Sequence, residues 1–319
     1  MMHFSEMMET RLISMASVFL LMTFLASPLL GDDNLQKVGV IRGYEGVKAY
    51  AAAAKKSDPS NHTALYNELV TMPYMQECSG DGAHFSMSRS FLETPIQKTA
   101  ELAAIVHAIE EHGVESKILA WLTIARGELS IPELTVCIFP YSPDARSVER
   151  IKRDLNGNMG FSETGGLLWT QFIPADGWLE SLPHMVVHEY HHAVTNGYFP
   201  QRTEDPTLLD VLISEGGAEA FALTLNPPAT NEPVATMSKE LQAEVWPQMR
   251  KHLESKDPDI LQLIFFGDGQ RVPRSAVYAI GTEIVLSFLK NNTHLTAAEW
   301  SALSARDLLD RSGYNPGHQ

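Results

Sequence analysis

The residues best suited to chemistry lie in the run His188-Glu189-Tyr190-His191-His192, which fits the pattern H-E-x-x-H. Residues i and i+4 share one face of a helix, so His188 and His192 can offer their imidazoles to one metal ion. Glu189 follows the first of these histidines, so its carboxylate would lie beside the metal's open position and could accept a proton from bound water. Two imidazoles and an adjacent carboxylate are the inner set of a zinc hydrolase, although they also suit other divalent ions.

A second acidic pair downstream can complete the ligands of the metal. Glu215 and Glu219, in the segment Leu212–Ala222, again stand at positions i and i+4. Because a tetrahedral catalytic zinc takes three protein ligands and a water, we predict Glu215 as the third ligand. Glu219 is predicted to accept a hydrogen bond from a ligand histidine and so to orient it. The alternative for this pair is two solvated glutamates on an amphipathic helix.

The first motif needs a helix to carry it, and the sequence marks the ends of one. We predict this helix over Leu182–Asn196, capped by Ser181, with Pro183 in its first turn and Gly197 just beyond its end. The apolar residues on both sides of the motif allow this helix to lie in a core.

The second motif is predicted to lie on a helix of its own. Asp205-Pro206 supplies a cap followed by a proline at the first helical position, and Asn226-Pro227-Pro228 closes the segment. Gly216 and Gly217 lower the helix propensity, and we interpret them as allowing close approach to the first helix.

Together the two motifs resemble the gluzincin type of zinc metallopeptidase. The residues around His188–His192 and Ser214–Gly216 are similar to the central pattern of the DUF2268 family of predicted zinc-dependent proteases, over residues Ile131 to Leu289. The resemblance implies that Glu215 is the third ligand and that Glu219 supports a ligand histidine. It also implies a zincin-like fold, one catalytic Zn²⁺ and a peptide or protein substrate.

The residues next to the first motif narrow this resemblance. Metzincins continue the motif with a glycine and a third histidine. Thr195 and Tyr198 stand at those two positions, which excludes that group. His191 points to another face of the helix and is predicted to be structural. His184 lies at the predicted start of the helix, and a surface role is expected for it.

Tyr278 is the candidate donor for the oxyanion of the tetrahedral intermediate. It begins Tyr278-Ala279-Ile280-Gly281, which resembles a Tyr-x-x-Gly segment that recurs in the family, on a helix predicted over Arg274–Leu289. Zinc peptidases commonly use such a donor opposite the metal. The alternative is a tyrosine on the apolar face of that helix, in the core.

Strands are predicted between the N-terminal part and the first motif. Thr135–Pro140 and Gly165–Ile173 have strand composition, and Gly157–Phe161 leads into the glycine-rich stretch between them. The resemblance to zincins implies an edge strand above the metal helix that pairs with an extended substrate. The alternative is an ordinary sheet strand with a glycine turn.

The N-terminus is predicted to direct the chain out of the cytoplasm. Leu12–Leu30 is nearly uncharged and apolar, which is typical of an export signal. The run is also long enough to span a bilayer, so an uncleaved anchor that holds the chain at a membrane is the alternative. A buried helix is the least favoured interpretation, because no polar stripe divides the run.

Composition excludes some classes of protein. With 44% hydrophobic and 20% charged residues, the chain is not typical of a disordered protein. A formal net charge of −15 argues against nucleic acid as a partner. The two cysteines, Cys78 and Cys137, could pair if the chain is exported, or Cys137 could simply be buried in its strand.

These observations predict an α+β, zincin-like protein in which a small sheet packs on the active-site helix. Residues 1–31 form the signal or anchor, 32–130 a helical lead-in, and 131–319 a metallopeptidase domain whose C-terminal part is mostly helical. The predicted function is zinc-dependent hydrolysis of peptide bonds. The alternatives are a zinc- and peptide-binding module that does not cleave, and a hydrolase of a non-peptide amide. The helices predicted in the lead-in cover Gly46–Lys56, Thr63–Glu77, Pro95–Glu111 and Glu115–Arg126.

Overall fold

A computed structural model describes residues 37–79, 87–163, 165–199, 205–225, 237–268 and 271–316. The predicted signal or anchor at Leu12–Leu30 lies outside these residues. Within the described ranges, no helix combines the length and apolar character that crossing a bilayer requires. The stretch from Gln36 to Gln319 forms one compact unit, which is a mixture of helices and a small sheet.

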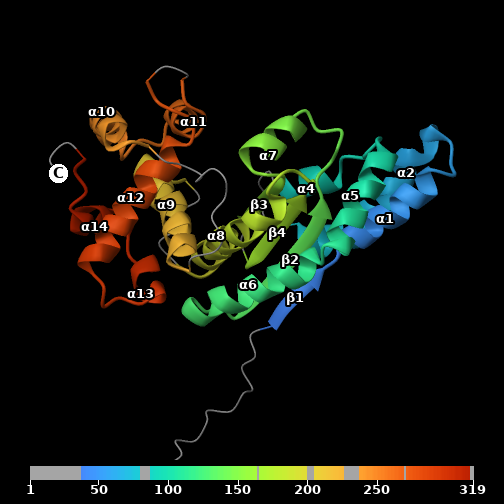
Figure 1. Cartoon of the computed structure of the whole chain (residues 1–319), viewed down its shortest axis with the longest axis horizontal. Helices are drawn as coiled ribbons and strands as arrows, with labels where there is room; N and C mark the ends of the chain where they lie inside the picture. The colour runs from blue at the N-terminus through green and yellow to red at the C-terminus, as the bar shows by residue number, and fades with distance from the viewer. Residues whose placement is uncertain are drawn as a thin grey trace, which may run out of the picture. The chain divides into compact units, whose positions relative to one another are not determined.

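Four strands form one mixed sheet in the described part of the chain (Figure 1). Their spatial order is β1 (Lys37–Ile41), β2 (Glu133–Pro140), β4 (Leu167–Phe172) and β3 (Asn158–Glu163). The first three run parallel and β3 runs antiparallel to β4. Strand β4 is buried along its whole length, as its continuous run of large residues requires of a strand covered on both faces.

The two faces of the sheet are covered by different helices. Cys137 and Trp169 are paired in register on one face, where Phe91 of α4 (Met87–Leu92) stacks parallel to the Trp169 ring. On the opposite face, Gly160 and Ser162 of β3 contact α8 (Trp178–Tyr198), which carries the first motif. Because side chains alternate along a strand, the face that carries Cys137 and Trp169, here called the structural face, packs against α4. The opposite face packs against α8, the helix of the first motif.

The N-terminal lead-in is helical as predicted, with one exception. Strand β1 lies where no strand was predicted, and its Val38 pairs with Leu134 of β2. The lead-in and the following residues thus share one sheet. The helices and helical turns here are α1 (Gly43–Ala54), a 3₁₀ turn (Pro59–Asn61), α2 (His62–Tyr66), a π-helical turn (Asn67–Thr71), α3 (Met72–Cys78), α5 (Thr99–Glu111) and α6 (Val114–Glu128).

Cys78 and Cys137 form a disulfide, which was one of the two outcomes expected for them. The bond joins α3 to β2 and closes a loop of 59 residues, with both cysteines fully buried. A loop of this length restricts the unfolded chain by about 4 kcal/mol in the chain-entropy estimate. The disulfide therefore fixes the structural face of the sheet.

The C-terminal half is mostly helical, as expected. Helix α9 (Leu208–Thr224) carries the second motif, and α12 (Ala276–Asn291) packs along it more extensively than any other pair of elements in the described residues. The remaining helices are α7 (Val148–Asp154), α10 (Lys239–Met249), a 3₁₀ turn (Arg250–His252), α11 (Pro258–Phe266), α13 (Ala297–Ser301) and α14 (Ala305–Ser312).

Both motif helices begin differently from the prediction. Helix α8 begins at Trp178, so Ser181 is not its cap, and its hydroxyl instead accepts a hydrogen bond of 2.6 Å from the Asn158 amide of β3. Helix α9 begins at Leu208, where Thr207 and Asp210 form a capping box. Asp205-Pro206 therefore lies before the helix and does not cap it. In both cases the predicted helix is present, but the predicted cap lies a few residues away from the residue that precedes the helix in the structure.

The two glycines of the second motif serve two different contacts. A Cβ on Gly216 would lie 2.0 Å from the carbonyl carbon of Gly281, so α9 and α12 touch backbone to backbone. Gly217 faces the first motif helix, as predicted, with the ring of His191 3.2 Å from the position of its Cβ. The interpretation of close approach to α8 thus holds for Gly217, whereas Gly216 allows the approach of α12.

We predict that Gly281→Ala lowers the free energy of unfolding by about 1–3 kcal/mol, because its Cβ would lie 2.1 Å from the backbone oxygen of Leu212. Urea unfolding measures this. Gly127→Ala in α6 is the matched control, since no atom lies within 4 Å of its Cβ position. The control should be neutral or slightly stabilising. Equal losses in both variants would contradict the assigned helix contact.

Candidate metal centre

Three donor atoms from two helices converge on one point. On α8, the Nε2 atoms of His188 and His192 lie 3.1 Å apart. On α9, Oε2 of Glu215 lies 3.6 Å from the first of these nitrogens and 3.4 Å from the second. Both histidines are 8% exposed. Two imidazoles and one carboxylate at these separations form a donor set that fits a zinc ion with an open fourth position.

The electrostatics of the cluster follow from its burial and its charges. Burial alone would lower the pKa of His188, but the carboxylates of Glu215 and Glu219 outweigh it and raise that pKa well above 6.5. Burial would likewise raise the pKa of the Glu215 carboxyl, but His192 and His188 outweigh it and hold that pKa far below 4.5. Glu215 is therefore ionised over the whole neutral range and is available as an anionic ligand.

Glu189 lies next to these donors but in a different environment. Burial raises the pKa of its carboxyl above 4.5, and the nearby His188 and His192 oppose that shift only in part. Glu189 and His188 both line a cleft of about 150 Å³ beside the cluster. A carboxylate with a raised pKa at the wall of a cleft is suited to accept a proton there.

Strand β3 fixes the position of Glu189. Ser162 donates a hydrogen bond of 2.6 Å to the backbone oxygen of Glu189, which ties α8 to the strand. Gly160 lies directly against the same side chain: a Cβ there would be 2.5 Å from Cγ of Glu189 and 2.6 Å from Sδ of Met185. The absence of a side chain at Gly160 thus leaves the space that Glu189 occupies.

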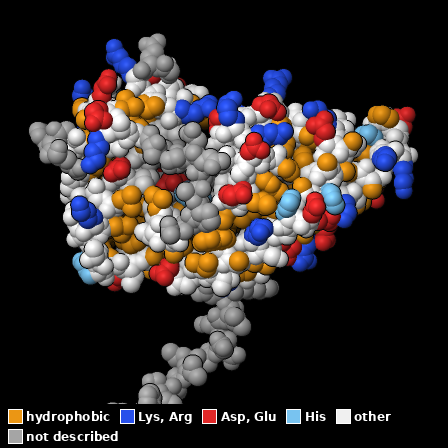
Figure 2. All heavy atoms as spheres, in the orientation of Figure 1, with side chains coloured by type: hydrophobic (Ala, Val, Ile, Leu, Met, Phe, Trp, Pro, Cys, Tyr) orange, Lys and Arg blue, Asp and Glu red, His pale blue; other side chains and the backbone are white. Residues whose placement is uncertain are grey.

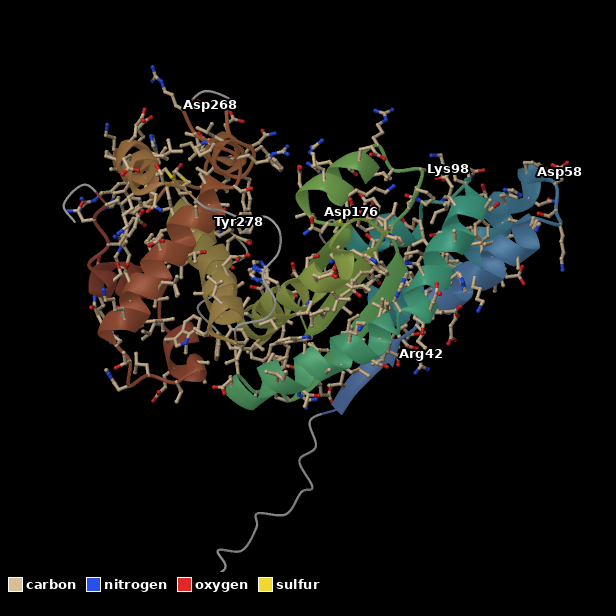
Figure 3. The ribbon with its side chains drawn as sticks, in the orientation of Figure 1. Arg42, Asp58, Lys98, Asp176, Asp268 and Tyr278 are labelled. Atoms are coloured by element: carbon tan, nitrogen blue, oxygen red, sulfur yellow. A yellow bond between two sulfur atoms is a disulfide. The ribbon has the colours of Figure 1, made fainter. Side chains whose placement is uncertain are left out.

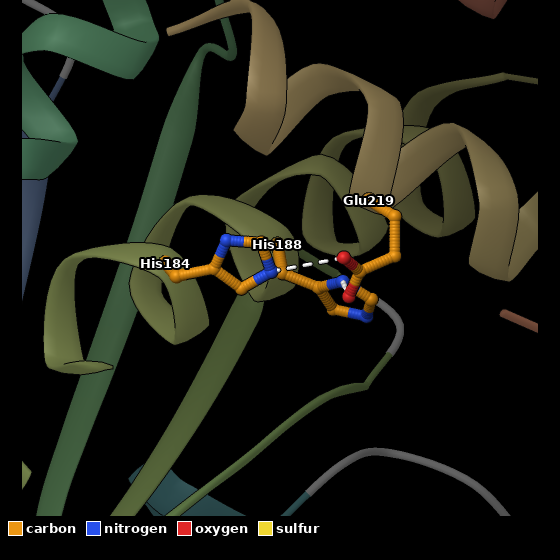
Figure 4. A group of neighbouring side chains, drawn as sticks. All are labelled: His184, His188 and Glu219. Atoms are coloured by element: carbon orange, nitrogen blue, oxygen red, sulfur yellow. Dashed lines mark hydrogen bonds and ion pairs between the residues drawn. The ribbon is translucent and has the colours of Figure 1, made fainter. Parts of the chain in front are cut away.

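Glu219 contacts two histidines of α8 (Figure 4). Its Oε1 lies 2.9 Å from Nδ1 of His188, and its Oε2 lies 3.0 Å from Nε2 of His184. The expected surface role of His184 is wrong, because this residue is 8% exposed and lines the cleft. Since α8 begins earlier than predicted, His184 lies inside the helix, one turn before His188 and on the same face.

His192, the second histidine of the first motif, also has a partner that the sequence reasoning missed. Nδ1 of His192 lies 3.4 Å from the hydroxyl of Ser214 on α9. His191, by contrast, faces away from the cleft, where its ring stacks on Trp300 and its Nε2 lies 3.0 Å from the Ser301 hydroxyl. Its contacts agree with the structural role predicted for it.

Tyr278 lies at the start of α12 (Figure 3). It lines the same cleft as His188 and Glu189. Its ring centroid is 6.2 Å from that of His188. Burial and the nearby Glu215 carboxylate raise the pKa of Tyr278 well above 10, so its hydroxyl keeps its proton and can donate a hydrogen bond. An ion pair of 2.8 Å between Arg274 and Asp154 ties the segment before α12 to the end of α7.

The strand predicted at Gly165–Ile173 is not at an edge of the sheet. It forms β4, which lies between β2 and β3. The strand that packs on α8 and lies at an edge of the sheet, within the residues that the structure describes, is β3. It occupies the segment interpreted from the sequence as the approach to a glycine-rich stretch. Its Gly160 and Ser162 are small, and this weakened the strand pattern in the sequence.

Comparison with known proteins agrees with these observations. The family model "Predicted Zn-dependent protease (DUF2268)" matches residues 116–310. The uncharacterized protein YjaZ of Bacillus subtilis is 31% identical over 142 residues, which cover 44% of this chain and 54% of that protein. The uncharacterized protein YjfC of the same organism is 27% identical over 168 residues, covering 49% and 56%. The chain thus spans about half the length of these curated relatives, and no solved structure matches it.

We predict that His188→Ala and His192→Ala each abolish stoichiometric zinc binding, because two remaining ligands rarely hold the ion. Glu215→Ala should weaken binding substantially, and Glu219→Ala by about 10- to 100-fold, as expected for a partner of a ligand. Metal content and competition with a chelator measure these effects, and far-UV circular dichroism checks the fold. One tightly held zinc ion in all of the first three variants would refute the ligand assignment.

We also predict that Gly160→Ala keeps the zinc affinity while reducing turnover. The new Cβ would displace Glu189, which is not among the predicted ligands, and the three atoms nearest to it belong to Glu189 and Met185, not to His188 or His192. A loss within the range of about 10²- to 10⁴-fold, typical of a removed general base, is expected. Gly39→Ala on β1 of the same sheet is the matched control, because the atoms nearest to its Cβ position are at ordinary contact distances of 3.7 and 3.9 Å. If Gly160→Ala turned over substrate as fast as the unaltered chain, the lack of a side chain at residue 160 would not be needed to position Glu189.

Proposed function

The chain belongs to the DUF2268 family of predicted Zn-dependent proteases, and on this premise we propose that it is a zinc metallopeptidase that hydrolyses peptide bonds. The observation that carries the proposal is the convergence of two imidazole nitrogens and one carboxylate beside a second carboxylate that has no ligand role. A site built only to bind zinc has no need of the second carboxylate. The packing of the sheet on α8 supports a zincin-like arrangement.

In this proposal His188, His192 and Glu215 would hold one zinc ion. Such an ion, when bound, lowers the pKa of a water molecule and polarises the substrate carbonyl. Ser214 and Glu219 lie against Nδ1 of the two histidines, so both imidazoles are held with Nε2 toward the common point. Fixing the second nitrogen also selects the tautomer that a metal ligand requires.

Glu189 is proposed as the general base and then the general acid. Its carboxylate would accept a proton from the attacking water and later deliver it to the nitrogen of the leaving amine. The raised pKa of this group makes both transfers easier near neutral pH than they would be for an exposed carboxylate. Contact with Gly160 and the tie from Ser162 keep its side chain against the cleft.

Tyr278 is proposed to stabilise the oxyanion that forms on the substrate carbonyl. It approaches the cleft from α12, so it can act on a substrate opposite to the α8 ligands. Because its hydroxyl stays protonated, it can donate a hydrogen bond to an oxygen that becomes negative. The edge strand β3 borders the same cleft through Gly160, and we propose that an extended peptide pairs with its free side.

Peptides or proteins outside the cytoplasm are the proposed substrates. The disulfide between Cys78 and Cys137 supports export, because such bonds persist mainly in oxidising compartments. Nucleic acid is not a proposed partner. The face drawn in Figure 2 shows acidic and basic side chains interspersed. The net charge of −15 opposes binding to a phosphate backbone. Membrane attachment through Leu12–Leu30 stays the alternative to a cleaved signal.

We predict that Glu189→Gln keeps the zinc and the fold while losing about 10²- to 10⁴-fold or more in turnover, because the amide cannot accept the proton. Cleavage of a peptide library, with zinc content measured on the same samples, tests this. Unchanged turnover in this variant would refute the proposed mechanism. If the unaltered chain binds zinc but cleaves no peptide or protein in broad libraries, it is a binding module.

Tyr278→Phe is the comparison variant, with an expected loss on the order of 10²- to 10³-fold if the hydroxyl binds the oxyanion. Because a substrate carbonyl gains charge only in the transition state, this loss should appear in kcat with little change in KM. A loss confined to KM would place Tyr278 in substrate binding instead.

A further inference from the structure

Glu219 is held at both carboxylate oxygens by the same helix. Its Oε1 lies 2.9 Å from Nδ1 of His188 and its Oε2 lies 3.0 Å from Nε2 of His184 (Figure 4). All three residues are buried, with exposed fractions of 6% for the glutamate and 8% for each histidine. The carboxylate therefore bridges two successive turns of α8.

We propose that His184 is a positioning residue of the zinc site, acting through Glu219 on the ligand His188. This inference rests on the proposed function, because it assumes that His188 holds zinc through Nε2. His184 would donate a hydrogen bond from Nε2 to one oxygen of Glu219. The other oxygen would then be fixed as the acceptor for the Nδ1 proton of His188.

The physical argument concerns the freedom of the Glu219 side chain. A glutamate has three rotatable bonds, and a single hydrogen bond to His188 would leave its carboxylate free to swing about that contact. A second hydrogen bond at the other oxygen restricts this motion and so restricts the ring orientation of His188. One helix can supply both donors because His184 and His188 stand at positions i and i+4, on the same face of α8.

A rival interpretation of the same three residues is a second metal site. His184, His188 and Glu219 bring their donor atoms within 4.8 Å of one another. In that arrangement His188 would bind one ion through each nitrogen and would lose both ring protons, which an ordinary neutral ligand histidine does not do. The 3.0 Å separation between Nε2 of His184 and Oε2 of Glu219 is also typical of a hydrogen bond to a carboxylate, and Oε1 lies within ion-pair distance, 2.9 Å, of Nδ1 of His188. The hydrogen-bonded chain is the simpler account.

The experiment compares two replacements of His184 in the full chain. His184→Gln keeps a hydrogen-bond donor, whereas His184→Leu removes it at similar bulk. Zinc affinity is measured by competition with a chelator at fixed pH, and thermal unfolding is measured with chelator present. We expect His184→Leu to lose about 10- to 100-fold in zinc affinity, and His184→Gln to recover most of that loss.

His62→Leu is the matched control for loss of a buried histidine. His62 is 9% exposed and makes a hydrogen bond of 3.1 Å to the Ala54 oxygen, in a different part of the fold. Its replacement should lower the unfolding temperature and leave the zinc affinity unchanged. A purely structural role for His184 would give the same result as this control and would overturn the proposal.

A double-mutant cycle tests whether His184 acts through Glu219. In a Glu219→Ala background, His184→Leu should cause little further loss of zinc affinity, since the connecting carboxylate is gone. Fully additive losses would overturn the proposed route. Two zinc ions in the unaltered chain, falling to one in His184→Leu, would identify a second metal site instead. Absence of zinc binding by the unaltered chain would refute the proposed function itself, and it is the only result that removes both ideas together.

Discussion

The backbone contact between α9 and α12 is the constraint on which the cleft depends. Gly216 and Gly281 meet with no room for a Cβ on either helix, so the axes of the two helices are held at the shortest distance that packing allows. Glu215 directly precedes the first glycine, and Tyr278 stands three residues before the second. The spacing of these helices therefore sets how far Glu215, the proposed third ligand, lies from Tyr278 at the wall of the cleft. A larger residue at either glycine would change both positions at once.

Burial and charge together set the protonation of the carboxyl groups in the buried cluster. Glu189, Glu215 and Glu219 bring three carboxyl groups beside three imidazoles, and burial opposes the ionised form of each carboxyl group. Ionised carboxylates in such a place need cations or several donors. Neighbouring histidines lower the pKa values of Glu215 and Glu219 by charge and hydrogen bonding. For Glu189 the effect of burial is larger than that of the histidines, and its pKa is raised. One environment thus separates two ionised carboxylates from one that can exchange a proton.

The sequence predicted the parts of the site that depend on local spacing. The relation of His188 to His192, and of Glu215 to Glu219, needs only a helix, and both helices are present. What the sequence could not predict depends on contacts between distant residues. Strand β1 is short and pairs with residues almost a hundred positions later, so nothing near it in the sequence marks it as a strand. His184 was missed for the same reason, because its partner Glu219 lies 35 positions downstream on another helix.

A chain of contacts connects the N-terminal region to the carboxylate of Glu189. The disulfide fixes α3 to β2, β2 pairs with β4, and β4 pairs with β3. Strand β3 in turn places Gly160 and Ser162 against Glu189. Phe91 of α4 covers the Trp169 ring on the opposite face, so the sheet has an apolar core on the side away from the cleft. A sheet buried on one side only would leave that face to water, and the edge strand would lose the rigidity that keeps Glu189 beside His188 and His192. The helical lead-in carries no recognised catalytic motif. It therefore contributes to the site indirectly, by packing on the face of the sheet that is turned away from the cleft.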